Sequence, residues 1–173
     1  EWIQVYLETR GVGALSWGPE LAWHVRRGTA VLGRTVASLQ VYDTLRALQA
    51  VREMLPEESG RIGLAASGEM AAVALYAARL DGRVQRLGLH DPPATQNAGS
   101  TSDGRGPALE MLSCLKVTDL PEVAALLWPA ELIFIRQRPE TYRLAEDTYR
   151  NLGPEGAVRR VPAAQDWRNP WIR

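Results

Sequence analysis

The sequence predicts an α/β domain built on a parallel sheet. Short apolar runs typical of strands alternate with helical segments along most of the chain, and Gly, Pro or Asp-Gly turns separate them. Strict alternation of strand and helix gives right-handed crossovers, which make neighbouring strands parallel. The length of 173 residues suits one domain with its own core. We therefore expect a single domain over residues 1–173, with about five strands and helices on both faces of the sheet.

The composition narrows the classes of partner and cofactor. Basic and acidic side chains balance at 20 each, so no long-range field favours nucleic acid or a membrane surface. No stretch approaches the length of an apolar membrane helix. The single Cys114 excludes an internal disulfide, and one cysteine with two histidines cannot fill a closed metal site. Gly11-Val12-Gly13 lacks the third glycine of a dinucleotide-binding fingerprint. We therefore expect neither a bound metal nor a cofactor. The sequence does not indicate the cellular compartment.

The first half of the chain should contain two strands and two helices. Residues 3–7 are apolar with Val and Tyr, which favours a strand, and the glycines that follow indicate a loop. Apolar residues at three- and four-residue spacing predict a long helix over 36–55, before Pro56. Residues 61–65 should be a second strand and the Ala- and Leu-rich residues 71–80 a helix.

The second half continues the alternation. We expect a third strand over 84–89, an exposed polar loop over 94–106, and two short helices over 107–115 and 120–127. A fourth strand should span 131–135, an amphipathic helix 139–152 and a last strand 157–161.

Three segments carry a recognisable pattern: residues 41–48 read Val-Tyr-Asp-Thr-Leu-Arg-Ala-Leu, 61–71 read Arg-Ile-Gly-Leu-Ala-Ala-Ser-Gly-Glu-Met-Ala, and 74–81 read Ala-Leu-Tyr-Ala-Ala-Arg-Leu-Asp. Together they resemble the region around the nucleophile in α/β-hydrolases of the acetyl xylan esterase and prolyl oligopeptidase kind. Residues 9–13, Thr-Arg-Gly-Val-Gly, are similar to the Arg-Gly-x-Gly loop of such enzymes, and 120–135 to a later helix and strand. The resemblance implies an α/β-hydrolase fold and, more weakly, an esterase activity.

The resemblance also implies what should lie outside this chain. Such hydrolases have about three more strands upstream, and that region also supplies the loop that completes the oxyanion hole. We therefore expect either part of a longer hydrolase or a domain that has rebuilt its sheet. The exposed edge of the first strand should then pair with an upstream domain of the same polypeptide or with a second copy of the chain.

The nucleophile position can be assigned in two ways. Ser67 is the serine of the expected strand-to-helix turn, with Ala65 and the bulky Glu69 two positions away. Counting back from the helix with the family's spacing instead puts Gly68 at the nucleophile position, which leaves none. A third interpretation makes Ser67 the N-cap of the helix, with Glu69 favourable in its first turn.

The resemblance places a histidine after the last strand and an acid after the strand over 131–135. Residues 162–167 contain no histidine, and the basic residues Arg136 and Arg138 stand where the carboxylate belongs. Neither expected partner of a catalytic serine is therefore in its usual place.

Two histidines remain, His24 and His90. His90 should end the third strand, at the sheet edge where ligands bind in folds of this class. Asp91 follows it directly, so we expect the two side chains to diverge, with Asp91 forming a turn with Pro92 and Pro93.

Two hypotheses follow. The leading one is a hydrolase-like domain without a working triad that has a structural or binding role, with a carbohydrate ester as its ligand. The alternative is an active ester hydrolase in which Ser67 attacks and His90 or an upstream segment moves the proton. The pocket should form where Gly13, Ser67, His90 and Arg136 converge, with Gly68 and Asp91 beside them. A histidine within hydrogen-bond reach of Ser67 would favour the alternative.

Overall fold

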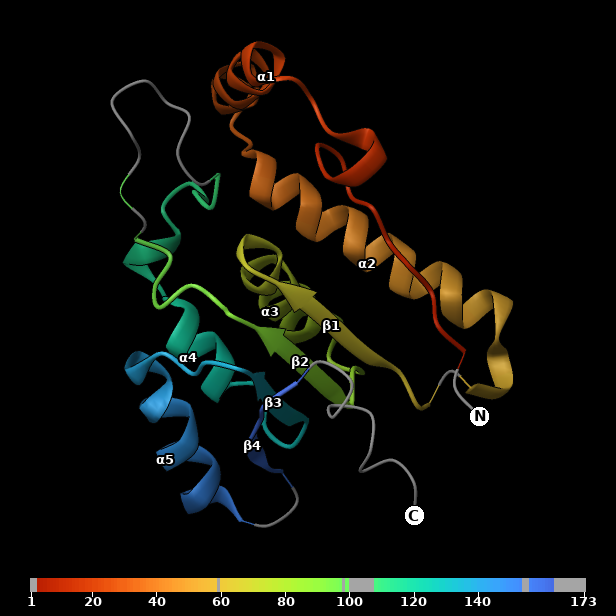
Figure 1. Ribbon diagram of the computed structural model, residues 1–173, viewed down its shortest axis with the longest axis vertical. Helices are drawn as coiled ribbons and strands as arrows, with labels where there is room; N and C mark the ends of the chain where they lie inside the picture. Colours follow the sequence, from red (N-terminus) through yellow and green to blue (C-terminus); the bar gives the residue numbers. More distant parts are fainter. Residues whose placement is uncertain (1–2, 59, 98, 100–107, 154–155, 164–173) are drawn as a thin grey trace.

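A four-stranded parallel sheet with helices around it gives this chain an α/β fold, as the sequence predicts (Figure 1). The structure is a computed structural model that describes residues 3–58, 60–97, 99, 108–153 and 156–163. Within these residues the strand order follows the chain: β1 Gly63–Ser67, β2 Arg86–His90, β3 Glu131–Ile135 and β4 Val158–Val161.

Local capping chemistry sets where several helices begin. The helices are α1 Pro19–Val31, α2 Val36–Met54, α3 Glu69–Asp81, α4 Leu120–Ala125 and α5 Arg143–Leu152. Thr35 and Ser38 form a capping box at the start of α2, in which Ser38 N donates to Thr35 Oγ1 at 3.1 Å. Asp119 and Glu122 form the same arrangement before α4. Within the described residues, no helix is both long and apolar enough to cross a membrane.

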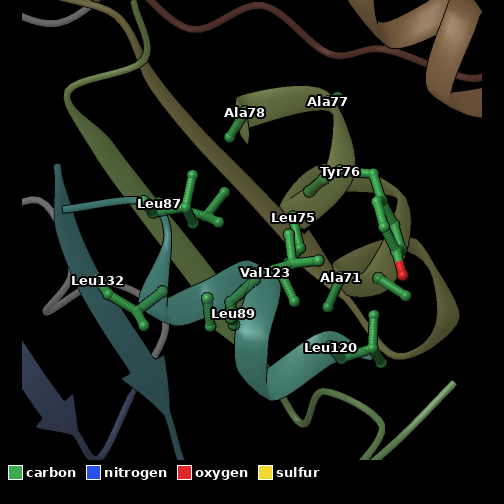
Figure 2. Close-up of a cluster of buried hydrophobic side chains, with 14 of the residues drawn as sticks. Ala71, Leu75, Tyr76, Ala77, Ala78, Leu87, Leu89, Leu120, Val123 and Leu132 are labelled. Carbon is green, nitrogen blue, oxygen red and sulfur yellow. The ribbon is translucent and has the colours of Figure 1, made fainter. Parts of the chain in front are cut away.

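The core lies between the sheet and one layer of helices. Helix α3 packs on β1 and β2, α4 packs on α3, and α5 packs on α4 and β4. Figure 2 shows Leu87, Leu89 and Leu132 from the strands beside Leu75 and Val123 from the helices. All five are at most 3% exposed, and each such side chain contributes roughly 1.5–3 kcal/mol by burial. This packing fixes the strand ends that carry the site.

The long helix α2 forms an outer layer. It packs on α3, and Arg52 of α2 forms two hydrogen bonds with Asp81 at the end of α3, at 2.6 and 2.7 Å. Both side chains are nearly inaccessible to solvent. The pair therefore joins the two helices at their C-terminal ends.

The strand expected over residues 3–7 is wrong. These residues form no strand, and Ile3, Val5, Tyr6 and Leu7 are 44–87% exposed. Strand propensity cannot replace a hydrogen-bonded neighbour, and no described strand is hydrogen-bonded to this segment. The expected pairing was assigned to the strand over residues 3–7 and is not tested; in the described sheet the edge strands are β1 and β4.

Two further differences concern helices. The helix expected over 107–115 is wrong for its described part, where only the short turn Cys114–Lys116 is helical and Ser113 has a φ of 61°. The side chain of Gln96 donates to Leu109 O at 2.7 Å, which ties this segment to the core as a loop. Helix α1 was not predicted, and it fully buries no residue, although Ala22 and Val25 on one face are half-buried.

Candidate functional site

Strands β1, β2 and β3 end at the same level, which brings their last residues together. Ser67 is in register with His90, and His90 is in register with Ile135. Strand β1 begins and ends two residues later than predicted, so Ser67 is its last residue and not the N-cap of α3. The N-cap is Gly68, which makes no side-chain capping bond, and Glu69 lies in the first helical turn as expected.

Each of these three strands is followed by a residue with positive φ. The φ angles are 57° at Gly68, 47° at Asp91 and 66° at Arg136. Residues other than glycine adopt this conformation at a cost of about 1–2 kcal/mol. Such positions cluster at functional sites.

Ser67 and His90 are joined by a hydrogen bond. Ser67 Oγ lies 2.9 Å from His90 Nδ1 across the strand pair. If Nδ1 accepts, the histidine carries its proton on Nε2, and the imidazole can take a proton from the serine hydroxyl. The sequence named both residues, and the parallel register explains why they meet.

His90 and Asp91 also lie close together, so the expectation that their side chains diverge is wrong. His90 Nε2 is 3.6 Å from Asp91 Oδ2, a distance for electrostatic attraction and too long for a hydrogen bond. The expected turn at Asp91 is present, since the chain bends there and Asp91 has a φ of 47°. Its carboxylate cannot accept from the backbone of residue 93, because Pro93 has no N–H, and it contacts other side chains.

Arg136 completes the cluster. Its Nη1 donates to Asp91 Oδ2 at 2.8 Å, so the carboxylate lies between the imidazole and the guanidinium. The side chains of Arg136 and Asp91 are 57% and 34% exposed. Ser67, His90, Asp91 and Arg136 therefore form a continuous polar chain across the ends of β1, β2 and β3, which we call the strand-end cluster.

The backbone amides at the turn favour Gly68 over Ser67 as the equivalent of a nucleophile position. An acyl-transfer site uses the N–H of the residue after the nucleophile to bind the oxyanion. The residue after Ser67 is Gly68, whose N–H already donates to His90 O at 2.9 Å. The residue after Gly68 is Glu69, the first residue of α3, whose N–H has no intrahelical carbonyl to bond. A Cβ atom at Gly68 would meet nothing within 4 Å.

The other predicted residues are not joined to the cluster by contacts. Gly13 lies beside Glu8, whose carboxylate accepts from Ala14 N at 2.9 Å. His24 lies in α1 and makes an edge contact with Trp23, with ring centroids 4.9 Å apart. Convergence of Gly13 with the cluster therefore stays a prediction. Of residues 162–167, where the histidine was sought, 164–167 lie outside the described residues.

A shallow cavity of about 520 Å³, largely open to solvent, lies beside Arg136 at the ends of β3 and β4, lined by Arg136, Gln137, Arg160, Val161 and Pro162. Arg159 and Arg160 follow each other in β4. The structure separates them, because Arg159 pairs with Glu131 at the beginning of β3, whereas Arg160 lines the cavity. The available signal was position, since Arg160 is the second-last residue of a strand.

The comparisons with known proteins support the fold. No protein-family model matches the sequence, and no curated protein matches it. Among solved structures, the chain is similar to a protein of Bacteroides fragilis NCTC 9343 described as a "putative acetyl xylan esterase". The TM-score is 0.68 at 15% identity, over 95% of this chain and 47% of that one. This chain thus spans less than half the length of its structural neighbour and has an esterase-like fold.

Proposed function

We propose that this chain is an esterase-fold domain that binds a carbohydrate ester without cleaving it by serine chemistry. The observation that supports this most directly is the turn after β1. Gly68 occupies the apex, with a φ of 57° and a ψ of −130°, and it has no side chain to attack an acyl group. The serine beside it is followed by an N–H that is already bonded.

A binding role is supported by the position and openness of the strand-end cluster. Ligands of open parallel sheets bind beyond the carboxyl ends of the strands, where Ser67, His90, Asp91 and Arg136 lie. Hydroxyl, imidazole, carboxylate and guanidinium groups offer both donors and acceptors for sugar hydroxyls. The carbohydrate ester is chosen because the structural neighbour's description names an acetyl xylan esterase.

Intact-mass spectrometry after incubation with a fluorophosphonate tests the absence of an activated serine. We expect no adduct on the folded wild-type chain or on Ser67→Ala. Folding is checked by circular dichroism, so that absence of labelling cannot be assigned to an unfolded sample. A wild-type adduct that disappears in Ser67→Ala would contradict the proposal.

A second candidate function, an active serine ester hydrolase, is favoured by the contact between Ser67 and His90. The 2.9 Å distance from Oγ to Nδ1 is within the range expected for a nucleophile and its base. Asp91, 3.6 Å from the other ring nitrogen, would stabilise the imidazolium that forms. Another donor would have to replace Gly68 N in binding the oxyanion.

His90→Gln discriminates the two candidates. If Ser67 is a nucleophile, this variant should lose fluorophosphonate labelling together with Ser67→Ala, because a serine without a base attacks poorly. His24→Gln is the matched control, since it removes the other histidine and lies in α1. If neither wild type nor control is labelled, the hydrolase candidate fails.

A further inference from the structure

We propose that the cavity at the ends of β3 and β4 binds a carboxylate, so that the ligand of this domain is an acidic carbohydrate. The inference rests on the proposed binding function and gives it a ligand class. Two arginines, Arg136 and Arg160, are among the residues that line the cavity. Guanidinium groups bind carboxylates through two parallel hydrogen bonds, which a neutral sugar hydroxyl cannot replace.

Arg160 is held in position by the neighbouring strand end. Its Nε donates to the carbonyl oxygen of Arg136 at 2.7 Å. Among the residues that the structure describes, its two terminal nitrogens make no hydrogen bond or ion pair. An oriented guanidinium loses less side-chain freedom when it binds a ligand, which favours affinity.

Arg136 is only partly neutralised. One of its terminal nitrogens donates to Asp91, and its side chain is 57% exposed. Among the described residues that line the cavity none carries a carboxylate, so within this part of the structure the two arginines outweigh the single charge of Asp91 beside them. The chain as a whole is neutral, and this excess of positive charge is therefore local.

The remaining lining suits a sugar ring. Val161 and Pro162 offer apolar surface, and Gln137 offers an amide that both donates and accepts. The cavity adjoins the strand-end cluster through Arg136, which contacts Asp91. A sugar whose carboxylate lies between the two arginines would therefore extend its hydroxyls toward Asp91 and His90.

Titration followed by NMR chemical shifts tests this with two ligands that share a ring. The methyl glycoside of galacturonic acid carries the carboxylate, and the methyl glycoside of galactose does not. We expect the acid to bind about tenfold more tightly than the neutral sugar, and its affinity to fall as salt is added. Equal affinities, or binding of neither ligand, would overturn the inference.

Variants locate the carboxylate. Arg136→Gln and Arg160→Gln should each weaken binding of the acid by about tenfold and leave the neutral sugar unaffected. Arg150→Gln on α5 is the control with the same change of charge, because Arg150 is exposed and pairs with Asp147. If the control weakens binding as much as the other two, the effect is general charge and the inference fails. Arg160→Gln leaves the Asp91 contact intact and tests the cavity should Arg136→Gln fail to fold.

Inorganic phosphate distinguishes a carboxylate site from a general oxyanion site. We expect phosphate to compete with the sugar acid only weakly, and equal competition would overturn the carboxylate assignment. Failure of the proposed binding function has a different signature. It would appear as a fluorophosphonate adduct or as cleavage of an ester, whichever sugar binds more tightly.

Discussion

The same strands carry charged side chains at both ends, but the two ends differ in exposure. At the beginning of β2 and β3, Arg86 pairs with Glu131, and their side chains are 7% and 19% exposed. Glu131 also pairs with Arg159 of β4. At the other end, Asp91 pairs with Arg136, and these side chains are 34% and 57% exposed. The starting end joins three strands through one carboxylate, whereas the strand-end cluster keeps its charges accessible.

The difference shows that charge alone does not identify a functional site. Burial lowers the pKa of Arg86, and the attraction of Glu131 opposes that change. Such a desolvated pair contributes to structure only while both partners are present. An exposed pair contributes little to stability and can exchange its partner for a ligand. Breaking each end should therefore give effects of different size and kind.

Glu131→Gln should give the largest effect. It removes the shared carboxylate and leaves Arg86 and Arg159 without their common partner, which should cost about 3 kcal/mol of unfolding free energy. Urea denaturation followed by circular dichroism measures it. Glu140→Gln is the control, because Glu140 is 76% exposed and its loss should change stability by about 0.5 kcal/mol or less. Equal effects would show that the starting end does not hold the strands.

Gly68→Ala should cause the second-largest loss of unfolding free energy. The φ of 57° disfavours any side chain by about 1–2 kcal/mol, and the open space around Gly68 removes a steric explanation. Gly60→Ala is the matched control, since it also has open space but no positive φ. It should be neutral or stabilise by about 0.4–1 kcal/mol through the unfolded chain. If both variants behave alike in thermal unfolding, the turn is not strained.

Asp91→Asn should lower the stability by less than Gly68→Ala does, and it should strengthen the binding of a sugar acid. The lost ion pair with Arg136 is exposed, so the cost should be about 1 kcal/mol or less. Removing the competing carboxylate frees Arg136, so a sugar acid should bind more tightly. Calorimetric titration would contradict this if the affinity fell.

The sequence predicted the parts of the fold that depend on periodic burial. Helices α2 and α3 and strands β2 and β3 were found because their apolar residues repeat at helical spacing or form short runs between turns. The predictions for helix α1 and for the segment over residues 3–7 were wrong for opposite reasons. The helix fully buries no residue, and the segment is apolar without a hydrogen-bonded neighbouring strand.

The site was predicted as a set of residues but not as a geometry. Ser67, His90, Asp91 and Arg136 were named because they follow or end strands. Their contacts depend on register, which a single sequence does not contain, because a shift of one residue moves each side chain to the other face. The carboxylate of Asp91 lies near both His90 and Arg136 because the φ of 47° at Asp91 orients its side chain toward them.

An ion pair of intermediate exposure tests whether exposure sets the size of these effects. Arg10 and Asp43 join the N-terminal segment to α2, with side chains 39% and 22% exposed. The hydrogen bond from Arg10 lowers the pKa of Asp43 against the opposing effect of burial. A lowered folded pKa means that the stabilisation is complete above the unfolded pKa of about 3.9 and is lost as the pH falls further.

The unfolding free energy of wild type should therefore exceed that of Asp43→Asn by a constant amount between about pH 7 and pH 5. The difference should shrink below about pH 4, as Asp43 of the wild type is protonated. Denaturation series at several pH values measure it, and the difference should be smaller than that for Glu131→Gln, because solvent screens the Arg10 pair more. A difference as large as that for Glu131→Gln would mean that the number of hydrogen bonds, and not exposure, separates the two ends of the sheet.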